Sequence, residues 1–401
     1  MSHIQTLCVG FSMSSPLKKC LTWFVDRLIR LLQTCVIAML FRVCVALVGI
    51  ESYYNSVKSS QLTQTTENKM ATDEQSPGAK TRRVLLWAPP RSLSTAFERC
   101  ISALGDDVQI FHEMYTAACH IGPENQIKIP MFESVLRDPL YTYARVQKIL
   151  EAPAPPKKQI FFCKELAYTV DGKFDKLPAG YRHTFLIRHP ARVFISMNKM
   201  LKKYFARTFL NLQLNQVVPE GFVFKEMYRL FEHVTNDLGQ EPIIIDADDL
   251  MQNPLGVLCA YCNAVDIPFS PSMDKWRPIK EEKRSWIYST RIMIINKLIG
   301  QYERAFKTTG LEKHSERPID LSLISPDVLE ATKASIGYYE KMYALRLKPV
   351  KFSPKTTLQT HEQEQEEVSA TNDTDEPIET KNECVPVYLS KIALYTMANV
   401  I

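Results

Sequence analysis

The chain is poor in glycine, with 13 among its 401 residues, and the loop after its first predicted strand has none. This loop, within VLLWAPPRSLSTAFERC (residues 84–100), also lacks Gly-Lys-Ser/Thr. A Walker loop needs glycines for close backbone approach, a lysine for the terminal phosphates and a Ser/Thr for Mg²⁺. IIIDADDL offers Asp246, Asp248 and Asp249 only as weak candidates for a magnesium-binding acid. A nucleotide kinase or hydrolase therefore stays an alternative, and the absence of the glycines and the lysine argues against it.

The ten cysteines form no zinc set. Cys259 and Cys262 make up a CxxC, but it lies in a predicted helix and no second CxxC or nearby histidine completes a site. We therefore expect no metal, and reduced, partly buried thiols in a reducing compartment.

Positive charge is present but not concentrated. The net charge is +5, and residues 361–383 carry nine acids and one lysine, about −8, which leaves about +13 for the rest. A basic body of this kind suits an anionic small ligand and is too weakly clustered to indicate nucleic acid.

The composition divides the chain into four parts. We expect a basic and apolar segment over 1–50, a polar linker over 51–82, a folded domain over 83–350 and an acidic, mostly disordered tail over 351–401. The apolar run at 31–50 is long enough to span a bilayer, with basic residues before it, although Arg42 in its middle opposes insertion. The sequence from Met70 also looks like the start of a soluble protein. We expect a cytoplasmic location, with a type II anchor in a Golgi or secretory membrane as the alternative.

Strand and helix patterns alternate along the body. Five short apolar runs predict buried parallel strands, at residues 83–88, 107–112, 159–165, 183–189 and 241–247. Helical patterns lie between them, so we expect a three-layer α/β/α P-loop fold around a mostly parallel sheet of about five strands. Ligands in such sheets bind at the carboxyl ends of the strands.

Two segments at predicted strand ends suit an anion. After the first strand, Arg91, Ser92, Ser94 and Thr95 lie where a helix begins, with Ser92 or Ser94 as its N-cap. The free N–H groups and positive dipole of a helix start favour an anion, and a guanidinium adds charge. After the fourth strand, Arg188 and, two helical turns beyond Pro190, Ser196 can converge on one phosphate. The first segment alone could equally be a capped helix start with a surface arginine. The second alone could be a strand-end arginine paired to a carboxylate, followed by an ordinary helix serine.

Together, PRSLST and IRHPARVFIS resemble the P-loop sulfotransferase family, which uses 3′-phosphoadenosine 5′-phosphosulfate (PAPS). The PRS-x-ST form is closest to a branch sometimes labelled aminotransferase-like. The resemblance covers about residues 83–278. It implies that Arg91, Ser92, Ser94 and Thr95 bind the 5′-phosphosulfate, and that Arg188 and Ser196 bind the 3′-phosphate. Leu93 stands where the family usually has glycine.

The same resemblance implies catalytic residues. Glu113, after the second strand, matches a glutamate base, with the adjacent His112 as runner-up. Lys164, at the end of the third strand, matches a lysine that contacts the transferred sulfuryl group. Leu166 stands where the cytosolic enzymes have a base histidine, which favours Glu113.

These residues indicate transfer of a sulfuryl group from PAPS to a hydroxyl or amine of a small molecule or glycan. A non-catalytic nucleotide-binding protein on the same fold is the other alternative, supported by Leu93 and Leu166. Trp276 could cover the site, although core packing explains it as well, and Lys280, Lys283, Arg284 and Arg291 could contact a 3′-phosphate or form a solvated helix face. The acceptor and the oligomeric state have no signal in the sequence.

Overall fold

The computed structural model describes residues 81–125, 137–155, 157–208, 214, 218–276, 286–311, 318–319 and 324–351. The expected N-terminal segment over 1–50, with its apolar run at 31–50, the linker up to residue 80 and the tail from 352 lie outside the described residues. None of the helices in the described part of the chain has the length and apolar character to cross a bilayer.

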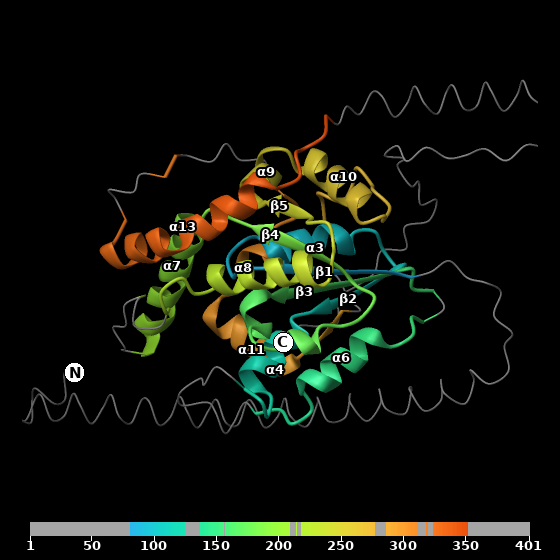
Figure 1. The fold of residues 1–401 in the computed structure, drawn as a ribbon. Coiled ribbons are helices and arrows are strands. Elements are labelled where there is room, and N and C mark those ends of the chain that lie inside the picture. Colours follow the sequence, from blue (N-terminus) through green and yellow to red (C-terminus); the bar gives the residue numbers. More distant parts are fainter. Residues whose placement is uncertain are drawn as a thin grey trace, which may run out of the picture. The chain divides into compact units, whose positions relative to one another are not determined.

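The centre of the molecule is a six-stranded sheet in which each neighbouring pair is parallel. Its order is β5-β4-β1-β3-β2-β6 (Figure 1). The strands are β1 (Arg82–Ala88), β2 (Val108–His112), β3 (Ile160–Leu166), β4 (Arg182–Ile187), β5 (Ile244–Asp246) and β6 (Ile287–Tyr288). The predicted fold class is confirmed. The five expected strands are present, and β6 is a sixth that the sequence pattern did not indicate.

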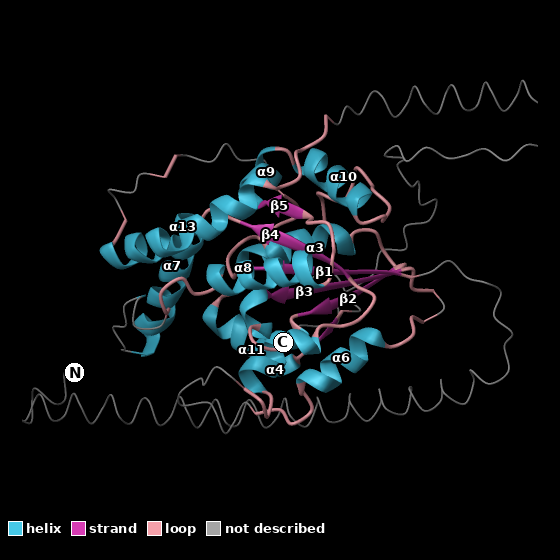
Figure 2. Ribbon diagram, viewed as in Figure 1, coloured by secondary structure: helices cyan, strands magenta, loops and turns pink. Residues whose placement is uncertain are grey.

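Helices cover both faces of the sheet (Figure 2). One face packs against α4 (Met114–Ile121), α6 (Tyr143–Glu151), α7 (Pro190–Thr208), α8 (Phe224–Glu232) and α13 (Pro326–Ala344). The other packs against α3 (Ser94–Ser102), α9 (Ala247–Gln252) and α10 (Pro254–Ala264). The remaining elements are α11 (Thr290–Ile299), α12 (Glu303–Lys307) and the short turns η1 (Ala167–Val170), η2 (Phe174–Lys176) and η4 (His233–Asp237).

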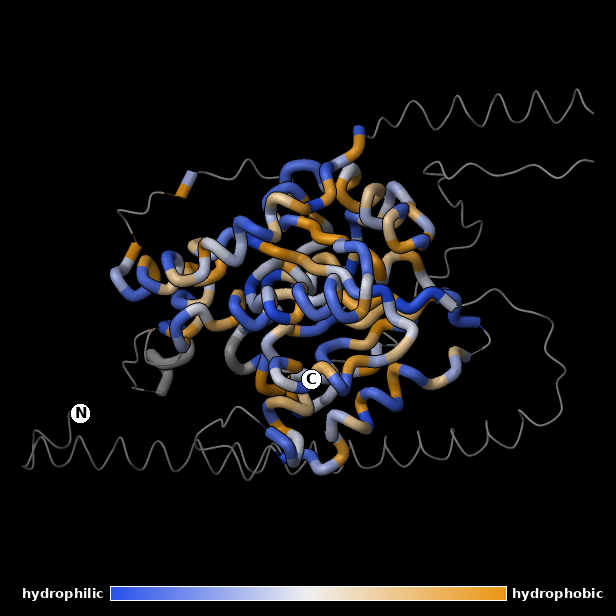
Figure 3. The backbone as a smooth tube through the Cα atoms, viewed as in Figure 1, coloured by the Kyte–Doolittle hydropathy of each residue, from blue (hydrophilic) through white to orange (hydrophobic). Residues whose placement is uncertain are grey.

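Two hydrophobic cores follow from the alternation of side chains along the strands. In β1, Leu85 and Trp87 join the core under α4 and α7, whereas Val84, Leu86 and Ala88 join the core under α3 and α10. All five are buried, which explains the continuous apolar run of this strand. α8 is amphipathic, with Phe224, Met227, Leu230 and Phe231 buried, and α13 shows hydrophobic and hydrophilic residues in turn along its length (Figure 3).

Two local features differ from the sequence pattern. The amphipathic pattern of residues 295–306 is typical of one helix, but α11 ends at Ile299, its C-cap Gly300 has a φ of 74°, and α12 begins at Glu303. The N-cap of α3 is Leu93 rather than Ser92 or Ser94, and it makes no side-chain capping bond. Cys100, Cys119, Cys163 and Cys262 are free and buried, as expected of reduced thiols.

Candidate functional site

The predicted site residues gather at one edge of the sheet, because all the strands are parallel and end there. Ala88 of β1 is in register with Leu166 of β3, and His112 of β2 with Lys164. Ile187 of β4 is in register with Asp246 of β5. The chain therefore carries the residues after each of these strands to the same edge, where parallel sheets bind ligands.

The loop between β1 and α3 has an unusual backbone. Arg91 and Leu93 have φ values of 66° and 69°, in the left-handed region that costs a non-glycine residue about 1–2 kcal/mol. The double bend aims the N-terminus of α3, with Ser94 and Thr95 in its first turn, into the site. Three of the five described non-glycine residues with positive φ, Arg91, Leu93 and Glu113, belong to this region. Such outliers persist where the surrounding structure holds them, often at functional sites.

The two predicted anion-binding segments meet. Arg91 Nε donates a hydrogen bond to Ser196 Oγ at 3.1 Å, although 105 positions separate them. Arg188 Nη1 donates to the carbonyl oxygen of Arg91, also at 3.1 Å. The β1–α3 loop and the β4–α7 connection therefore form one unit, with two guanidinium groups beside a serine hydroxyl.

The like charges of Arg91 and Arg188 interact at this point. Asp248 lies near Arg188, with 3.7 Å between Oδ1 and Nε, and it also pairs with Arg192 at 3.1 Å. Burial, and then the charge of Arg188, lower the pKa of Arg91 below its ordinary value. An anion placed between the two guanidinium groups would relieve both costs, because it supplies a countercharge and accepts their hydrogen bonds.

A cavity of about 170 Å³, the inner cavity, lies beside these groups. Its lining includes Arg91, Ser94, Thr95, Lys164, Arg188 and Ser196, together with Leu93, Leu166, Gln301 and Tyr302. Six of the nine predicted site residues thus share one cavity. Ser92, Glu113 and His112 do not line it; Ser92 is buried and its hydroxyl donates to the carbonyl oxygen of Pro89 at 2.8 Å.

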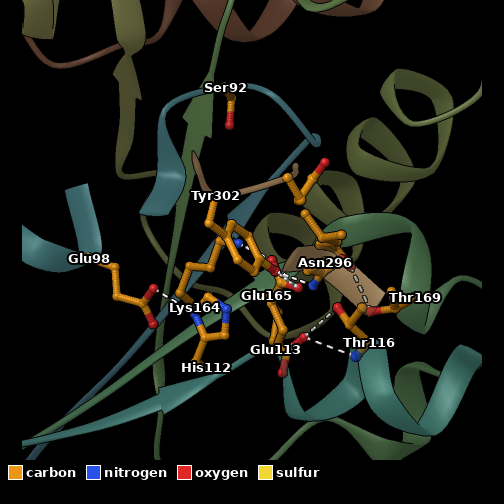
Figure 4. A network of polar contacts seen from close by, with 12 residues as sticks. Ser92, Glu98, His112, Glu113, Thr116, Lys164, Glu165, Thr169, Asn296 and Tyr302 are labelled. Atoms are coloured by element: carbon orange, nitrogen blue, oxygen red, sulfur yellow. Dashed lines mark hydrogen bonds and ion pairs between the residues drawn. The ribbon is translucent and has the colours of Figure 1, made fainter. Parts of the chain in front are cut away.

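A buried polar network lies behind the inner cavity (Figure 4). Lys164 Nζ donates to one carboxylate oxygen of Glu113, and the Tyr302 hydroxyl donates to the other. Asn296 Nδ2 donates to the Tyr302 hydroxyl at 2.6 Å. Glu113 directly follows β2 and is the N-cap of α4, so the sheet fixes its position opposite Lys164. The network ties the segment after α11 to the ends of β2 and β3.

The electrostatics of Glu113 follow from these contacts. Burial favours the neutral acid, but the charge of Lys164, helped by His112 and by the two hydrogen bonds, outweighs it and lowers the pKa to about 2. Glu113 is therefore ionised at neutral pH, as a general base must be. The same bonds make it a weak base, because proton affinity falls with pKa.

Two further acids accompany the network. His112 Nδ1 contacts Glu98 Oε2 at 2.7 Å, and both side chains are fully buried. Glu165, next to Lys164, accepts hydrogen bonds from the backbone N–H groups of Tyr115 and Thr116 at 2.7 and 3.1 Å. Burial raises the pKa of Glu165 to about 8 despite these bonds. The two hydrogen bonds satisfy N–H groups in the first turn of α4, the helix that Glu113 begins.

The three acids considered for magnesium have other partners. Asp246 is the N-cap of α9 and accepts from the N–H groups of Asp248 and Asp249. Asp248 pairs with Arg192, and Asp249 pairs with Arg346 at 2.7 Å. In the described part of the chain, no group of three or more His, Cys, Asp or Glu side chains is placed to bind a metal.

Four residues of the site had no sequence prediction: Glu98, Glu165, Gln301 and Tyr302. Gln301 is notable because its carbonyl oxygen accepts a hydrogen bond from Arg91 Nη1 at 2.5 Å. Trp276 is not part of the cavity lining; its Nε1 donates to the carbonyl oxygen of Thr308 at 2.8 Å, and it packs on the core beside α3. Of the predicted basic group, Arg291 is described and lies 3.6 Å from Asp138, whereas residues 277–285 are outside the described part.

Comparisons with known proteins give limited similarity. No family model matches. Branched-chain-amino-acid aminotransferase-like protein 2 of Arabidopsis thaliana is 27% identical over 258 residues, which are 61% of this chain and 39% of that protein. Its relative, protein 1, is 25% identical over 203 residues, 49% of this chain and 32% of that protein. The chain thus spans only about a third to two fifths of the length of these curated relatives.

Two solved structures are also similar in part. A sulfotransferase domain from the curacin biosynthetic pathway has a TM-score of 0.31 and 16% identity, and covers 49% of this chain and 78% of its own. A sulfotransferase domain from the Synechococcus PCC 7002 olefin synthase has a TM-score of 0.29 and 12% identity, and covers 65% of this chain and 96% of its own.

Proposed function

We propose that this chain is a sulfotransferase that moves a sulfuryl group from PAPS to a hydroxyl or amine of an acceptor. The observation that carries the proposal is the convergence of Arg91, Arg188 and Ser196 beside the first turn of α3. Two cations, a hydroxyl and helix N–H groups are the donor set that a bound phosphate or sulfate requires. PAPS would supply the activated sulfuryl group and a phosphate leaving group.

The residues present fit this cosubstrate. Arg91, Ser94 and Thr95 would hold the 5′-phosphosulfate at the first turn of α3, with Ser92 supporting the loop from within. Arg188 and Ser196 would hold the 3′-phosphate. Lys164 lines the inner cavity and would stabilise negative charge on the leaving phosphate.

We propose Glu113 as the general base. It is ionised, and it contacts Lys164 and Tyr302, which both line the inner cavity. To take a proton, Glu113 must exchange one of these hydrogen bonds for one from the acceptor. His112 stays the second candidate; its Nδ1 is held by Glu98, and within the described part of the chain its Nε2 has no hydrogen-bond partner.

A binding titration tests the proposal. We expect 3′,5′-adenosine bisphosphate to bind without Mg²⁺ and to bind at least tenfold more weakly to Arg188→Ala. Arg192→Ala is the matched control, because Arg192 contacts the same Asp248 but does not line the inner cavity. Equal affinity for 5′-AMP would contradict recognition of a 3′-phosphate, and a preference for ATP with Mg²⁺ would favour a kinase or hydrolase.

A non-catalytic nucleotide-binding protein is the second candidate. Two features favour it. Both carboxylate oxygens of Glu113 already accept hydrogen bonds, from Lys164 and Tyr302, and Leu93 and Leu166 line the inner cavity. Transfer of label from PAPS separates the two. We expect Glu113→Gln to keep nucleotide binding and to slow transfer at least a hundredfold. Nucleotide binding without any transfer by the unaltered protein, across sugars, phenols, sterols and amines, would favour the second candidate.

A further inference from the structure

The proposed general base lies behind the wall of the inner cavity. Glu113 does not line this cavity, whereas Lys164 and Tyr302 do, and each of these two side chains donates to one of its carboxylate oxygens (Figure 4). An acceptor in the inner cavity would therefore meet Lys164 and Tyr302 before the carboxylate. Direct proton transfer to Glu113 requires one of these hydrogen bonds to be exchanged, but a route through Lys164 or Tyr302 does not.

The two side chains differ in what they can accept. The ammonium group of Lys164 has three donors and no lone pair, so it cannot accept a hydrogen bond from the acceptor. The Tyr302 hydroxyl has one donor and two lone pairs. Among the described residues it donates to Glu113 and accepts from Asn296 Nδ2 at 2.6 Å, which leaves one lone pair for an O–H or N–H of the acceptor. Of the two, Tyr302 alone can take up a proton and release another to Glu113.

The connection between α11 and α12 fixes the position of Tyr302, which is the N-cap of α12. Asn296, near the end of α11, holds this connection twice: its carbonyl oxygen accepts from the N–H of Gln301 at 2.8 Å, and its side chain donates to the Tyr302 hydroxyl. The carbonyl oxygen of Gln301 also accepts from Arg91 Nη1 at 2.5 Å. Tyr302 is thereby held beside the loop that would bind the 5′-phosphosulfate.

The Tyr302 hydroxyl carries its proton in the resting site. Burial, and then the negative charge of Glu113, raise the pKa of Tyr302 well above its ordinary value. The pKa of Glu113 is about 2, so the proton between the two groups stays on the tyrosine. The acceptor oxygen becomes strongly acidic only as its bond to sulfur forms, which occurs late in a loose transition state. A weak base then suffices, because the proton is lost from an acidic group.

We propose that Tyr302 is a catalytic residue that relays the proton of the acceptor to Glu113; the proposal rests on the proposed function. The acceptor oxygen or nitrogen forms a bond to sulfur as the bond between sulfur and the 5′-phosphate oxygen breaks, and the electron pair of the broken bond leaves with the phosphate. The acceptor proton passes to the Tyr302 oxygen while the hydroxyl proton of Tyr302 passes to Glu113. Tyr302 ends unchanged, and Glu113 ends neutral and later returns the proton to water.

Transfer of labelled sulfuryl groups from PAPS by Tyr302→Phe tests the relay, because this variant keeps the ring and removes the hydroxyl. The probes are 2-phenylethanol and water, which must lose a proton, and 4-nitrophenol in mildly alkaline buffer, where it is already ionised. We expect Tyr302→Phe to slow transfer to 2-phenylethanol and water by about a hundredfold or more. Transfer to 4-nitrophenol and the affinity for 3′,5′-adenosine bisphosphate should change much less, because neither depends on the relay.

Tyr339→Phe is the matched control. Tyr339 also donates to a buried carboxylate, that of Asp246 at 3.1 Å, and it does not line the inner cavity. Asn296→Ala is a second variant that leaves Tyr302 and Glu113 in place and removes the donor to the Tyr302 hydroxyl. It should slow transfer to 2-phenylethanol and water by less than Tyr302→Phe does, again without a matching loss for 4-nitrophenol, and it tests the relay even where Tyr302→Phe does not fold.

Three results would overturn the relay alone. They are wild-type rates with 2-phenylethanol and water in Tyr302→Phe or Asn296→Ala, an equal loss with 4-nitrophenol, and an equal loss in Tyr339→Phe. Failure of the proposed function has a different signature. In that case the wild-type protein itself would transfer label to none of the three probes, and the relay would be overturned with the proposed function.

Discussion

Arg91 and Ser196 are joined by a hydrogen bond from Nε to Oγ at 3.1 Å, across 105 positions of the sequence. The first residue lies in the loop after β1, and the second lies on α7 after β4. Since β1 and β4 are neighbouring parallel strands, the sheet itself brings the two segments together. Such preorganisation lowers the cost of binding, because the donors are already in place.

Ser196→Ala should weaken 3′,5′-adenosine bisphosphate and leave 5′-AMP almost unchanged. A hydrogen bond to a charged group contributes about 1.5–3 kcal/mol, so we expect a loss of roughly ten- to hundredfold. Titration calorimetry measures both ligands. Ser272→Ala serves as the control, because Ser272 is an exposed serine away from the inner cavity. Parallel losses for both nucleotides would mean that Ser196 does not read the 3′-phosphate.

Leu93 provides a test of backbone strain. Leu93→Gly and Leu93→Ala remove the same packing, but glycine adopts a φ of 69° freely and alanine does not. We expect the glycine variant to be more stable than the alanine variant by about 1 kcal/mol in urea unfolding. At Ala331, inside α13, glycine should instead be less stable than alanine by about 1 kcal/mol. The same order at both positions would show that the left-handed conformation of Leu93 is not maintained in solution.

Five of the six strands could be predicted, because each of these five has a local signal in the sequence, whereas the two-residue β6 has none. The strand at 160–166 is buried on both faces, and its first four residues therefore form a continuous apolar run, which ends at Lys164 and Glu165. The strand ends then located Arg91, Lys164 and Arg188 together, since parallel strands finish at one edge. The helix break at Gly300 also had a local signal, because glycine after an apolar helical pattern often ends a helix.

Other parts of the site have no local signal. Tyr302 contacts Glu113 from 189 positions away, and the pattern around it is that of an ordinary amphipathic helix. The left-handed conformation of Leu93 could not be expected from its residue type, because leucine strongly avoids it. The pKa values of Glu113 and Glu165 depend on burial and on neighbouring groups from other strands, and only the folded chain brings these together.

Glu113 and Lys164 should be strongly coupled in stability. Glu113→Gln leaves a buried lysine without its countercharge, and breaking such a pair costs about 3–5 kcal/mol. The double variant Glu113→Gln/Lys164→Gln should lose less than the sum of the two single variants. Urea unfolding of the four proteins at pH 7 measures the coupling. Additive losses would mean that the buried pair does not form.

The lowered pKa of Glu113 predicts that the stability of the folded protein depends on pH in the acid range. Its pKa is about 2 in the folded protein and about 4.5 when unfolded, so its contribution to stability is complete above pH 4.5 and is lost as the pH falls toward 2. The difference in unfolding free energy between the wild type and Glu113→Gln should therefore shrink across this window. Comparing the two proteins isolates Glu113 from the other titrating groups. A difference that stays constant from pH 5 to pH 2.5 would contradict the lowered pKa.

Glu165 should have the opposite dependence. Burial raises its pKa from 4.5 to about 8, so the folded state holds a proton that the unfolded state has released. Between these values the unfolded state binds fewer protons, and stability falls as the pH rises. Glu165→Gln imitates the protonated acid and should become increasingly stable relative to the wild type from pH 4.5 to pH 8. Circular dichroism followed through urea unfolding at several pH values measures this trend. The opposite result would be a Glu165→Gln variant whose unfolding free energy falls relative to the wild type as the pH rises. It would mean that the ionised form of Glu165 stabilises α4, and that the hydrogen bonds from Tyr115 and Thr116 outweigh the effect of burial.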